Sequence, residues 1–188
     1  AFATQQIDAL TGLVLPSVLE TEAQVIFETM PGFFPRQWVP MLYDKTFFQQ
    51  ALSSGVPTWN IGAGANMAFR RSVFEKLGLF DERLGAGASG CSEDSELWYR
   101  ILAAGGSCLF EPLTVVFHSH RQDMPSLQRQ MQAYMKGHVS ALVAQYDRYQ
   151  HNGNLRRILF NLPRYYFRLG LKTLLSSEHP RRRLIRHE

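Results

Sequence analysis

The sequence predicts an α/β fold, because short apolar segments of strand length alternate along the chain with segments of helical periodicity. Residues 10–15, 64–70 and 113–117 have the composition of strands, whereas residues 93–104 and 127–149 carry apolar side chains at helical spacing. The strands are too few for a self-sufficient doubly wound sheet. We therefore expect a mixed sheet with flanking helices that belongs to a larger domain.

The first third of the chain contains one well-marked strand and one helix. Residues 10–15 are apolar and end at Pro16, and residues 20–29 place Ala23, Ile26 and Phe27 on one helical face. Residues 31–59 are rich in Pro, Gly and aromatic side chains and have no clear period. We expect a long irregular loop there with at most a short helix, and such loops often bind ligands.

The middle of the chain alternates strand and helix. The strand at 64–70 leads into a helix for which Ser72 and Glu75 form a capping-box pattern, and Gly78 ends it. A flexible glycine-rich loop at 85–90 precedes a second helix, which starts near Ser92 and ends at 105–106. Its predicted buried stripe consists of Leu97, Trp98, Ile101 and Leu102.

The last part of the chain is predicted to contain two strands followed by two helical stretches. Pro112 separates the strands at 107–110 and 113–117, and Pro163 interrupts the second helical stretch, 155–175. We divide the chain into a body, residues 1–150, and a basic amphipathic helical tail, residues 151–188.

Composition indicates a globular protein. Of its 188 residues, 45% are apolar and 19% charged, which suffices for one domain with a core. No apolar run approaches the roughly 18 residues that span a bilayer. Cys91 and Cys108 make neither a disulfide framework nor a zinc cluster, so we expect a reducing cytoplasm. The chain begins at Ala1 without a visible signal peptide, and we expect it to be a fragment.

The net charge of +4 is distributed unevenly. Residues 1–153 hold 11 Lys/Arg and 14 Asp/Glu, whereas residues 154–188 hold 9 Lys/Arg and 2 Glu. The tail places its arginines among apolar and aromatic residues. It either packs on the body with solvated arginines or lies on an anionic membrane surface. A basic stripe alone is poor evidence for nucleic-acid binding, which we do not expect.

Glu93 and Asp94 are the first candidates for chemistry. They follow a glycine-rich loop and open a helix, whose N-terminus stabilises an ionised carboxylate, so that a base there stays deprotonated. The alternative is that acidic residues simply favour a first helical turn.

Two further groups of residues are candidates for binding. His118 and His120 end a strand, where alternation points both rings to one side and allows a metal site; two ordinary surface histidines are the alternative. Gly62, Gly64 and Asn66 allow close approach to a ligand, although no Rossmann fingerprint surrounds them.

Taken in order, these motifs resemble the family 2 glycosyltransferases. The resemblance runs from about Leu10 to about Leu142. The motifs are Thr-Gly-Leu-Val-Leu-Pro (11–16), Asn-Met-Ala-Phe-Arg-Arg (66–71), Gly-Leu-Phe-Asp-Glu-Arg-Leu-Gly (78–85), Glu-Asp (93–94), Tyr-Arg-Ile-Leu-Ala-Ala-Gly-Gly (99–106), Phe-Glu-Pro (110–112) and His-Ser-His-Arg (118–121).

The resemblance implies a GT-A fold, here the partial, acceptor-side portion, followed by C-terminal helices. It implies an inverting single displacement in which a nucleotide-diphosphate sugar donates to a saccharide or lipid-linked acceptor, as in bacterial polysaccharide biosynthesis. The enzyme would work in the cytoplasm, peripheral at the inner face of the plasma membrane.

The resemblance also assigns roles to residues. Asp94 matches the general base, and Glu93 would support it or contact acceptor hydroxyls. His118, with His120 as the alternative, matches the ligand of a Mg²⁺ or Mn²⁺ ion. The remaining matches are Gly62, Gly64 and Asn66 in the donor-sugar and acceptor pocket, Arg70 in a structural or diphosphate-facing role, and Gln130 and Tyr134 on an interfacial or lid helix.

One departure from the family pattern concerns the donor. No two aspartates lie two residues apart, so the sequence has no Asp-x-Asp motif. We therefore expect the nucleotide-binding half to be absent and this chain alone to be inactive. A non-catalytic sugar- or partner-binding module on the same scaffold is the alternative.

Overall fold

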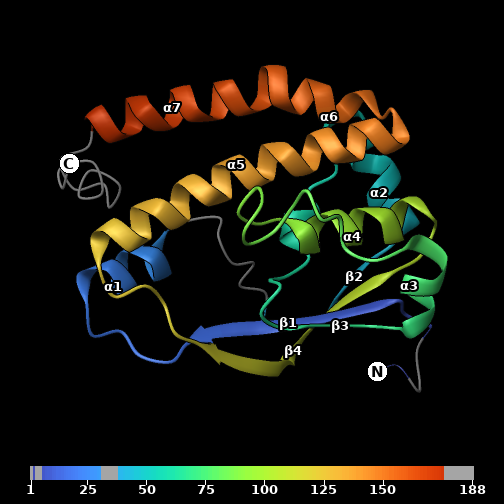
Figure 1. The fold of residues 1–188 in the computed structure, drawn as a ribbon, viewed down its shortest axis with the longest axis horizontal. Coiled ribbons are helices and arrows are strands. Elements are labelled where there is room, and N and C mark those ends of the chain that lie inside the picture. The colour runs from blue at the N-terminus through green and yellow to red at the C-terminus, as the bar shows by residue number, and fades with distance from the viewer. Residues whose placement is uncertain (1, 3–5, 31–37, 176–188) are drawn as a thin grey trace.

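The fold is built on a four-stranded mixed sheet. The structure, a computed structural model, describes residues 2, 6–30 and 38–175 (Figure 1). The strand order is β2 (Met41–Tyr43), β4 (Cys108–His118), β1 (Ala9–Pro16) and β3 (Met67–Phe69). β1 and β4 run parallel in the centre, and β2 and β3 pair with them antiparallel at the edges. The predicted α/β class with a mixed sheet and flanking helices is confirmed.

The helices form a second layer above the sheet in the view of Figure 1. They are α1 (Glu22–Thr29), α2 (Lys45–Ala51), α3 (Arg71–Leu77), α4 (Glu93–Ala103), α5 (Met124–Tyr149), α6 (Asn152–Arg156) and α7 (Leu162–Leu175). Short 3₁₀ turns lie at Leu52–Ser54 and Thr58–Asn60, and a π-helical turn at Arg157–Asn161 joins α6 to α7. Among the described helices, none is both long and apolar enough to cross a membrane.

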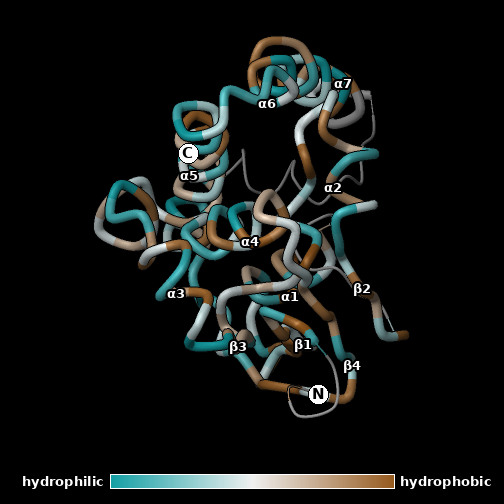
Figure 2. Tube along the Cα trace, turned by 90° about the vertical axis from the view of Figure 1, so that its right-hand side faces the viewer, coloured by the Kyte–Doolittle hydropathy of each residue, from teal (hydrophilic) through white to brown (hydrophobic). Residues whose placement is uncertain are grey.

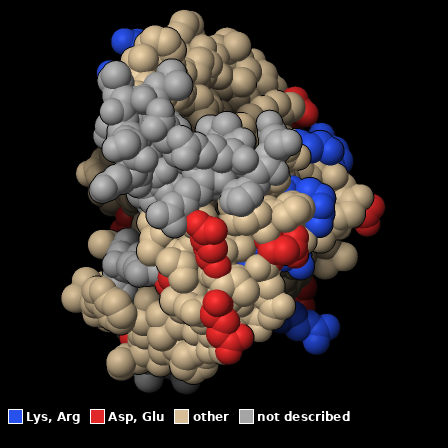
Figure 3. Space-filling model, turned by 90° about the vertical axis from the view of Figure 1, so that its left-hand side faces the viewer, with Lys and Arg blue, Asp and Glu red and all other residues tan. Residues whose placement is uncertain are grey.

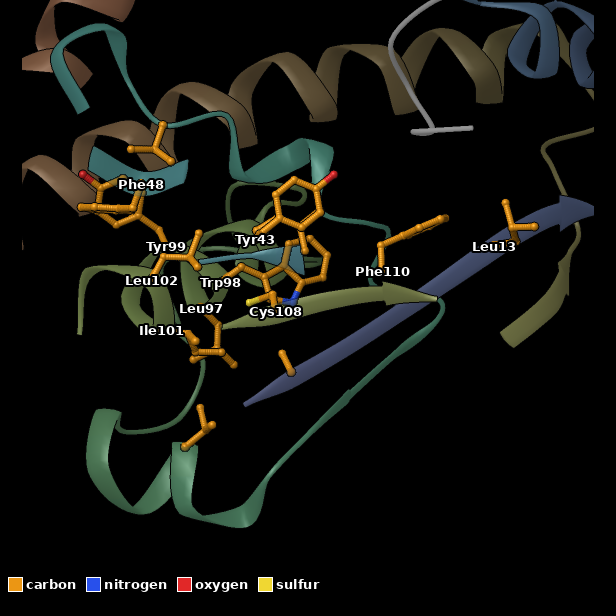
Figure 4. Close-up of a cluster of buried hydrophobic side chains, with 14 residues drawn as sticks. Leu13, Tyr43, Phe48, Leu97, Trp98, Tyr99, Ile101, Leu102, Cys108 and Phe110 are labelled. Carbon is orange, nitrogen blue, oxygen red and sulfur yellow. The ribbon is translucent and has the colours of Figure 1, made fainter. Parts of the chain in front are cut away.

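The main core lies between α4 and the sheet (Figure 4). The predicted stripe of α4 is confirmed, because Leu97, Trp98, Ile101 and Leu102 are each at most 1% exposed. Phe110 and Cys108 meet them from β4, and Tyr43 from β2. Burial of this apolar area fixes α4 against the centre of the sheet, and with it the first turn of α4.

Arg100, which forms a buried ion pair within α4, joins α4 to the end of α3. Arg100 Nε donates to Glu96 Oε2 over 2.8 Å, and both side chains are almost fully buried. The guanidinium also donates to the carbonyl oxygens of Leu77, at 2.8 Å, and Leu79, at 2.9 Å. These bonds satisfy carbonyls that the end of α3 would otherwise leave unpaired.

A second, smaller core joins α1 to α5. Ala23, Ile26, Phe27 and Met30 pack against Leu127 near the start of α5. α1 begins with a capping box between Thr21 and Gln24, and α5 begins at the N-cap Asp123, which accepts from Ser126 N. This contact brings α1 beside the N-terminal end of the long helix, as Figure 1 shows.

Three local predictions are wrong. Within the predicted loop, the strand β2 was not expected, because three residues are too few to show a period. The short helix that the prediction allowed is α2, and residues 31–37 lie outside the described part of the chain. The N-cap of α2, Asp44, accepts from Thr46 N and Phe47 N. Ser72 and Glu75 form no capping box, because α3 begins two residues earlier than that pattern requires, with Arg70 as an N-cap that lacks a side-chain bond. Strand ends and caps depend on tertiary contacts that a local pattern does not contain.

Pro112 does not divide the last strand, which is the third correction. β4 is one strand whose pairing with β1 shifts between Gly12 and Leu13, so that residues 112–114 have no partner on β1. Thr114 Oγ1 donates to the Glu111 carbonyl over 2.7 Å and holds this bulge. Proline fits here because a bulge does not need its missing N–H.

The predicted interruption of the tail helix at Pro163 is confirmed. Proline cannot donate to the carbonyl four residues earlier and its ring collides with that carbonyl. The chain responds with the π-helical turn at Arg157–Asn161, immediately before α7. α6 packs on the body through buried Asn154, whose amide donates to Tyr99 Oη over 3.4 Å.

Candidate active site

Asp94 lies in the first turn of α4, at the end of the glycine-rich loop. Its Oδ1 accepts from Ser95 N over 2.6 Å and from Ser95 Oγ over 3.1 Å. The Gly64 backbone approaches the other side of the carboxylate, since a Cβ atom there would lie 3.0 Å from Asp94 Oδ2. Ser92, the N-cap, has left-handed dihedral angles (φ 76°, ψ 13°), which turn the loop sharply into α4. The carboxylate is thus flanked on two sides.

Burial raises the pKa of Asp94 above its ordinary value, and the charge of the adjacent Glu93 raises it further. The hydrogen bonds from Ser95, together with the Gly64 backbone, oppose this rise. Desolvation thus opposes the stabilisation of the ionised carboxylate that we expected from the helix N-terminus. A carboxylate with a raised pKa accepts a proton more readily once it is ionised.

Glu93 lies against the glycine-rich loop. A Cβ atom on Gly85 would lie 3.2 Å from Glu93 Oε2, and Gly85 has a positive φ of 83°. Glycine at this position therefore permits both the turn of the loop and the close approach of the carboxylate. Glu93 and Asp94 are brought together at one end of α4, as predicted.

The segment that contains Gly62, Gly64 and Asn66 passes over the sheet beside Asp94. A Cβ atom on Gly64 would lie 3.0 Å from Asp94 Oδ2, and one on Gly62 would lie 2.6 Å from Thr11 Cβ. Asn66 Nδ2 donates to the carbonyls of Leu13 and Thr114, each at 2.9 Å. Gly64 therefore shapes the surroundings of Asp94, whereas Gly62 and Asn66 hold the segment to β1 and β4.

The described contacts of the Arg70 side chain are with the N-terminal segment and not with Asp94. Its Nε donates to the Ile7 carbonyl over 2.5 Å, its Nη2 donates to the Phe2 carbonyl over 2.6 Å, and its guanidinium lies 5.3 Å from the Phe2 ring centroid. Of the two roles that the sequence left open, these contacts favour the structural one.

His118 and His120 lie side by side at the end of β4, with their Nδ1 atoms 3.2 Å apart. His120 is 4% exposed, and its Nε2 lies 3.0 Å from Glu28 Oε2 on α1. Its ring also meets the Phe27 ring edge-on at 4.7 Å. Burial lowers the pKa of His118, and the nearby His120 and Arg121 lower it further, so His118 is neutral at neutral pH.

Tyr134 on α5 lies between the two groups. Its ring is 6.4 Å from Phe27, which contacts His120. Burial raises the pKa of Tyr134, nearby Cys91 and Asp94 add to the rise, and Arg121 opposes it. The carboxylate of α4 and the histidines of β4 therefore belong to one region beneath α5.

Gln130 completes this region. Its Nε2 donates to Tyr134 Oη over 2.9 Å. Its Oε1 is buried and has no hydrogen-bond partner within residues 2, 6–30 and 38–175. A buried acceptor of this kind is costly unless a ligand or water satisfies it.

Sequence reasoning missed Glu28 and Arg121 as parts of the region. Glu28 is 92 residues from His120, and a glutamate in the last turn of an ordinary amphipathic helix gives no signal. Figure 3 shows the α1 end of the molecule, where acidic side chains stand near the middle of the described surface and basic ones toward an edge. No single sign of charge marks this end as a site.

The histidines do not by themselves fit a Mg²⁺ or Mn²⁺ site. Among the described residues, no three His, Cys, Asp or Glu side chains gather to hold a metal. His120 uses both ring nitrogens on protein partners, and His118 uses Nδ1, so Nε2 of His118 is the nitrogen that could face a metal. Mg²⁺ prefers several oxygen ligands, which this arrangement does not supply.

Comparison with known proteins gives one match. A family model described as "Glycosyl transferase family group 2" matches residues 1–178. No curated protein and no solved structure matches the chain. The matched residues include β1, the segment beside Asp94, α4, the two histidines and α5.

Proposed function

The chain belongs to glycosyl transferase family group 2, and from this premise we propose that Asp94 is the general base of an inverting glycosyl transfer. Family membership supports glycosyl transfer from a nucleotide sugar to an acceptor in general. The observation that carries the assignment is the buried carboxylate of Asp94, held by Ser95 and approached by the Gly64 backbone.

The proposed step is one displacement. The acceptor oxygen attacks the anomeric carbon, and the bond from that carbon to the diphosphate oxygen breaks, its electron pair leaving with the diphosphate. Asp94 takes the acceptor's hydroxyl proton as the new bond forms. Since Ser95 occupies Oδ1, Oδ2 is the oxygen that we expect to receive the proton.

We assign acceptor contacts to Gln130, Tyr134 and Glu93. The buried Oε1 of Gln130 lacks a partner among the described residues, and an acceptor hydroxyl would satisfy it. Tyr134 receives a hydrogen bond from Gln130, and the nearby Asp94 adds to the rise in the pKa of Tyr134. Acceptor contacts here would place the reacting hydroxyl near Asp94.

His118 is the residue that we expect to face the diphosphate. A bound Mg²⁺ or Mn²⁺ ion would neutralise the leaving diphosphate. His118 could contribute Nε2, while His120 and Glu28 hold the His118 ring in place. The other ligands would have to come from the diphosphate or from outside the described residues, so we derive no step from the metal.

Replacing Asp94 with Asn in the protein that carries this chain tests the proposal. We expect kcat for transfer to fall by roughly 10²–10⁴-fold, the usual contribution of a general base, with the KM for acceptor little changed. Asp44→Asn is the matched control, since Asp44 caps α2 and touches none of the site residues. Unimpaired transfer by the Asp94→Asn variant would refute the assignment and favour a non-catalytic sugar- or partner-binding module.

A further inference from the structure

The tail presents an apolar and basic face to solvent. α6, the π-helical turn and α7 form an arm that runs above α5 in Figure 1. Leu159, Phe160, Phe167 and Leu171 on this arm are exposed, Phe167 to 70%. Figure 2 shows the mixture of hydrophobic and hydrophilic residues along the same arm. Large apolar side chains left in solvent on a helix usually mark an interaction surface.

Three exposed arginines lie among these apolar residues. Arg156, Arg164 and Arg168 are exposed, and residues 152–175 contain five Lys/Arg and no Asp or Glu. Arg156, Phe160 and Arg164 recur every four residues and line one open hollow of about 580 Å³ across the π-helical turn, together with Leu159. The basic and apolar side chains therefore share a face.

The opposite side of the arm is fixed to the body. Arg157 points inward, with its guanidinium 3.9 Å from the Trp59 ring centroid and its Nε 3.3 Å from His138 Nε2. Burial lowers the pKa of His138 to about 4, with a further contribution from Arg157, so the ring is a neutral acceptor at neutral pH. Asn154 and Leu162 are buried as well. The start of the arm is therefore held in a defined orientation, with its other face outward.

We propose that this outward face binds the surface of an anionic lipid bilayer. We call it the arm face and define it as Arg156, Leu159, Phe160, Arg164, Phe167, Arg168 and Leu171. Its arginines complement the charge of lipid phosphates, and its apolar side chains fit the boundary between head groups and acyl chains. Leu162 is turned toward the body, whereas Leu159, Phe160, Phe167 and Leu171 stay exposed, which packing on the body alone does not explain.

The proposal does not depend on the assignment of Asp94, because lipid binding is measured without transfer. It locates the protein peripherally on a negatively charged membrane surface, such as the inner leaflet of the plasma membrane. Lipid-linked acceptors would then be present at the same surface.

Flotation of the protein with vesicles tests the proposal. We expect binding to phosphatidylglycerol–phosphatidylcholine vesicles, weaker binding as salt is raised, and little binding to phosphatidylcholine alone. The triple variant Arg156→Gln, Arg164→Gln, Arg168→Gln should lower the partition coefficient on the order of 100-fold, since each basic residue near such a surface contributes about 1 kcal/mol.

The matched control is the triple variant Arg71→Gln, Arg83→Gln, Arg129→Gln, which removes the same charge from exposed arginines outside the arm. We expect it to bind vesicles nearly as well as the unaltered chain. Phe160→Ser with Phe167→Ser should weaken binding without changing its salt dependence. All variants change exposed side chains, and circular dichroism checks that they stay folded.

The proposal would be overturned if the protein bound neutral and anionic vesicles equally well. It would also be overturned if the two arginine triple variants lost vesicle binding to the same extent, or if the triple variant at Arg156, Arg164 and Arg168 bound as well as the unaltered chain. Binding to RNA that displaces the vesicles at similar affinity would also overturn it, and would make nucleic acid the partner of the arm face.

Discussion

Gly64 and Asp94 approach each other so closely that the size of one side chain decides the position of the other. A Cβ atom at position 64 would lie 3.0 Å from Asp94 Oδ2, and Gly64 does not have the positive φ that strains other residues. With Asp94 as the proposed base, Gly64 would therefore act on the transfer step through its contact with the carboxylate. Its backbone conformation alone would tolerate alanine.

Gly64→Ala should lower kcat for transfer by about tenfold or more while leaving the fold intact. The added methyl group pushes the carboxylate away from its position, and misplacement of a reacting group by about 1 Å costs up to 100-fold in rate. Gly170→Ala is the control, because Gly170 has open space around it. Steady-state kinetics measures the loss of kcat, and thermal melting shows whether the fold is intact. A Gly64→Ala variant with normal kcat would show that Asp94 does not need this contact.

The raised pKa of Asp94 predicts the acid limb of the pH–rate profile. The base must be ionised, so kcat/KM should fall as pH is lowered through the pKa of Asp94, with a midpoint above the ordinary aspartate value of 3.8. Glu93→Gln removes a neighbouring charge that raises this pKa and should move the midpoint to lower pH. A midpoint at or below the ordinary value, unmoved by Glu93→Gln, would contradict the role of burial.

At the scale of single residues, the sequence suggested Asp94 and His118 as candidates but did not show what surrounds them. Their positions follow from local patterns, an acidic helix start and a strand end. Glu28 belongs to the same region because α1 packs against α5 and so reaches His120, which no local pattern encodes, whereas Arg121 simply follows His120 in the chain. The rise in the pKa of Asp94 could not be predicted either, since it arises from burial under distant segments.

At the scale of elements, the docking of α6 depends on close contact between backbones. A Cβ atom on Gly153 would overlap the Leu52 carbonyl oxygen and crowd the Gly55 amide. Glycine is therefore the residue that lets α6 lie against the 3₁₀ turn at Leu52–Ser54. The same contact brings Arg157 to Trp59 and His138.

Gly153→Ala should lower the free energy of unfolding by about 1–3 kcal/mol, the usual cost of forcing an extra carbon into a packed site. Gly170→Ala, the same change in an uncrowded helix, should stabilise α7 slightly. Urea unfolding with tryptophan fluorescence measures both, since Trp59 lies beside the docked helix. Equal stability of the two variants would mean that α6 does not pack as described.

The long elements were predictable from periodicity, and the short ones were not. α4 has 11 residues and its predicted stripe is confirmed, whereas β2 spans three residues and is held by its pairing with β4. The capping box expected at Ser72 failed because pairing of β3 with β1 ends the strand at Phe69 and starts α3 at Arg71. Tertiary pairing overrode the local preference there.

At the scale of the whole molecule, the arm beyond the π-helical turn is separable from the body. Among the described residues, α7 makes its main contacts with the π-helical turn, whereas α6 packs on the 3₁₀ turn and on α5. The alternation of strands and helices predicted the class of the fold. It could not predict that α6 packs on the body while α7 mainly contacts the π-helical turn, because both parts of the tail have the same basic amphipathic composition.

Two truncations of the tail should therefore differ in how much they destabilise the protein. Removing residues 163–188 should change the melting temperature by no more than a few degrees and abolish binding to anionic vesicles. Removing residues 151–188 also uncovers Tyr99, whose hydroxyl bonds to His151 Nδ1 at 2.6 Å, and should destabilise the body clearly. Differential scanning calorimetry compares them. Equal destabilisation by both truncations would show that α7 is part of the core.

The bulge in β4 affects where the protein can accept insertions and deletions. The register against β1 shifts by three residues between Gly12 and Leu13, an odd number, so side chains after the bulge alternate in the opposite phase to those before it. The sides on which Phe117 and His118 emerge are set by their pairing with Leu15 and Pro16, not by the number of residues in the bulge. Because residues 112–114 have no partner on β1, a change of length there can leave that pairing intact. Natural variation in the length of β4 should therefore concentrate at 112–114.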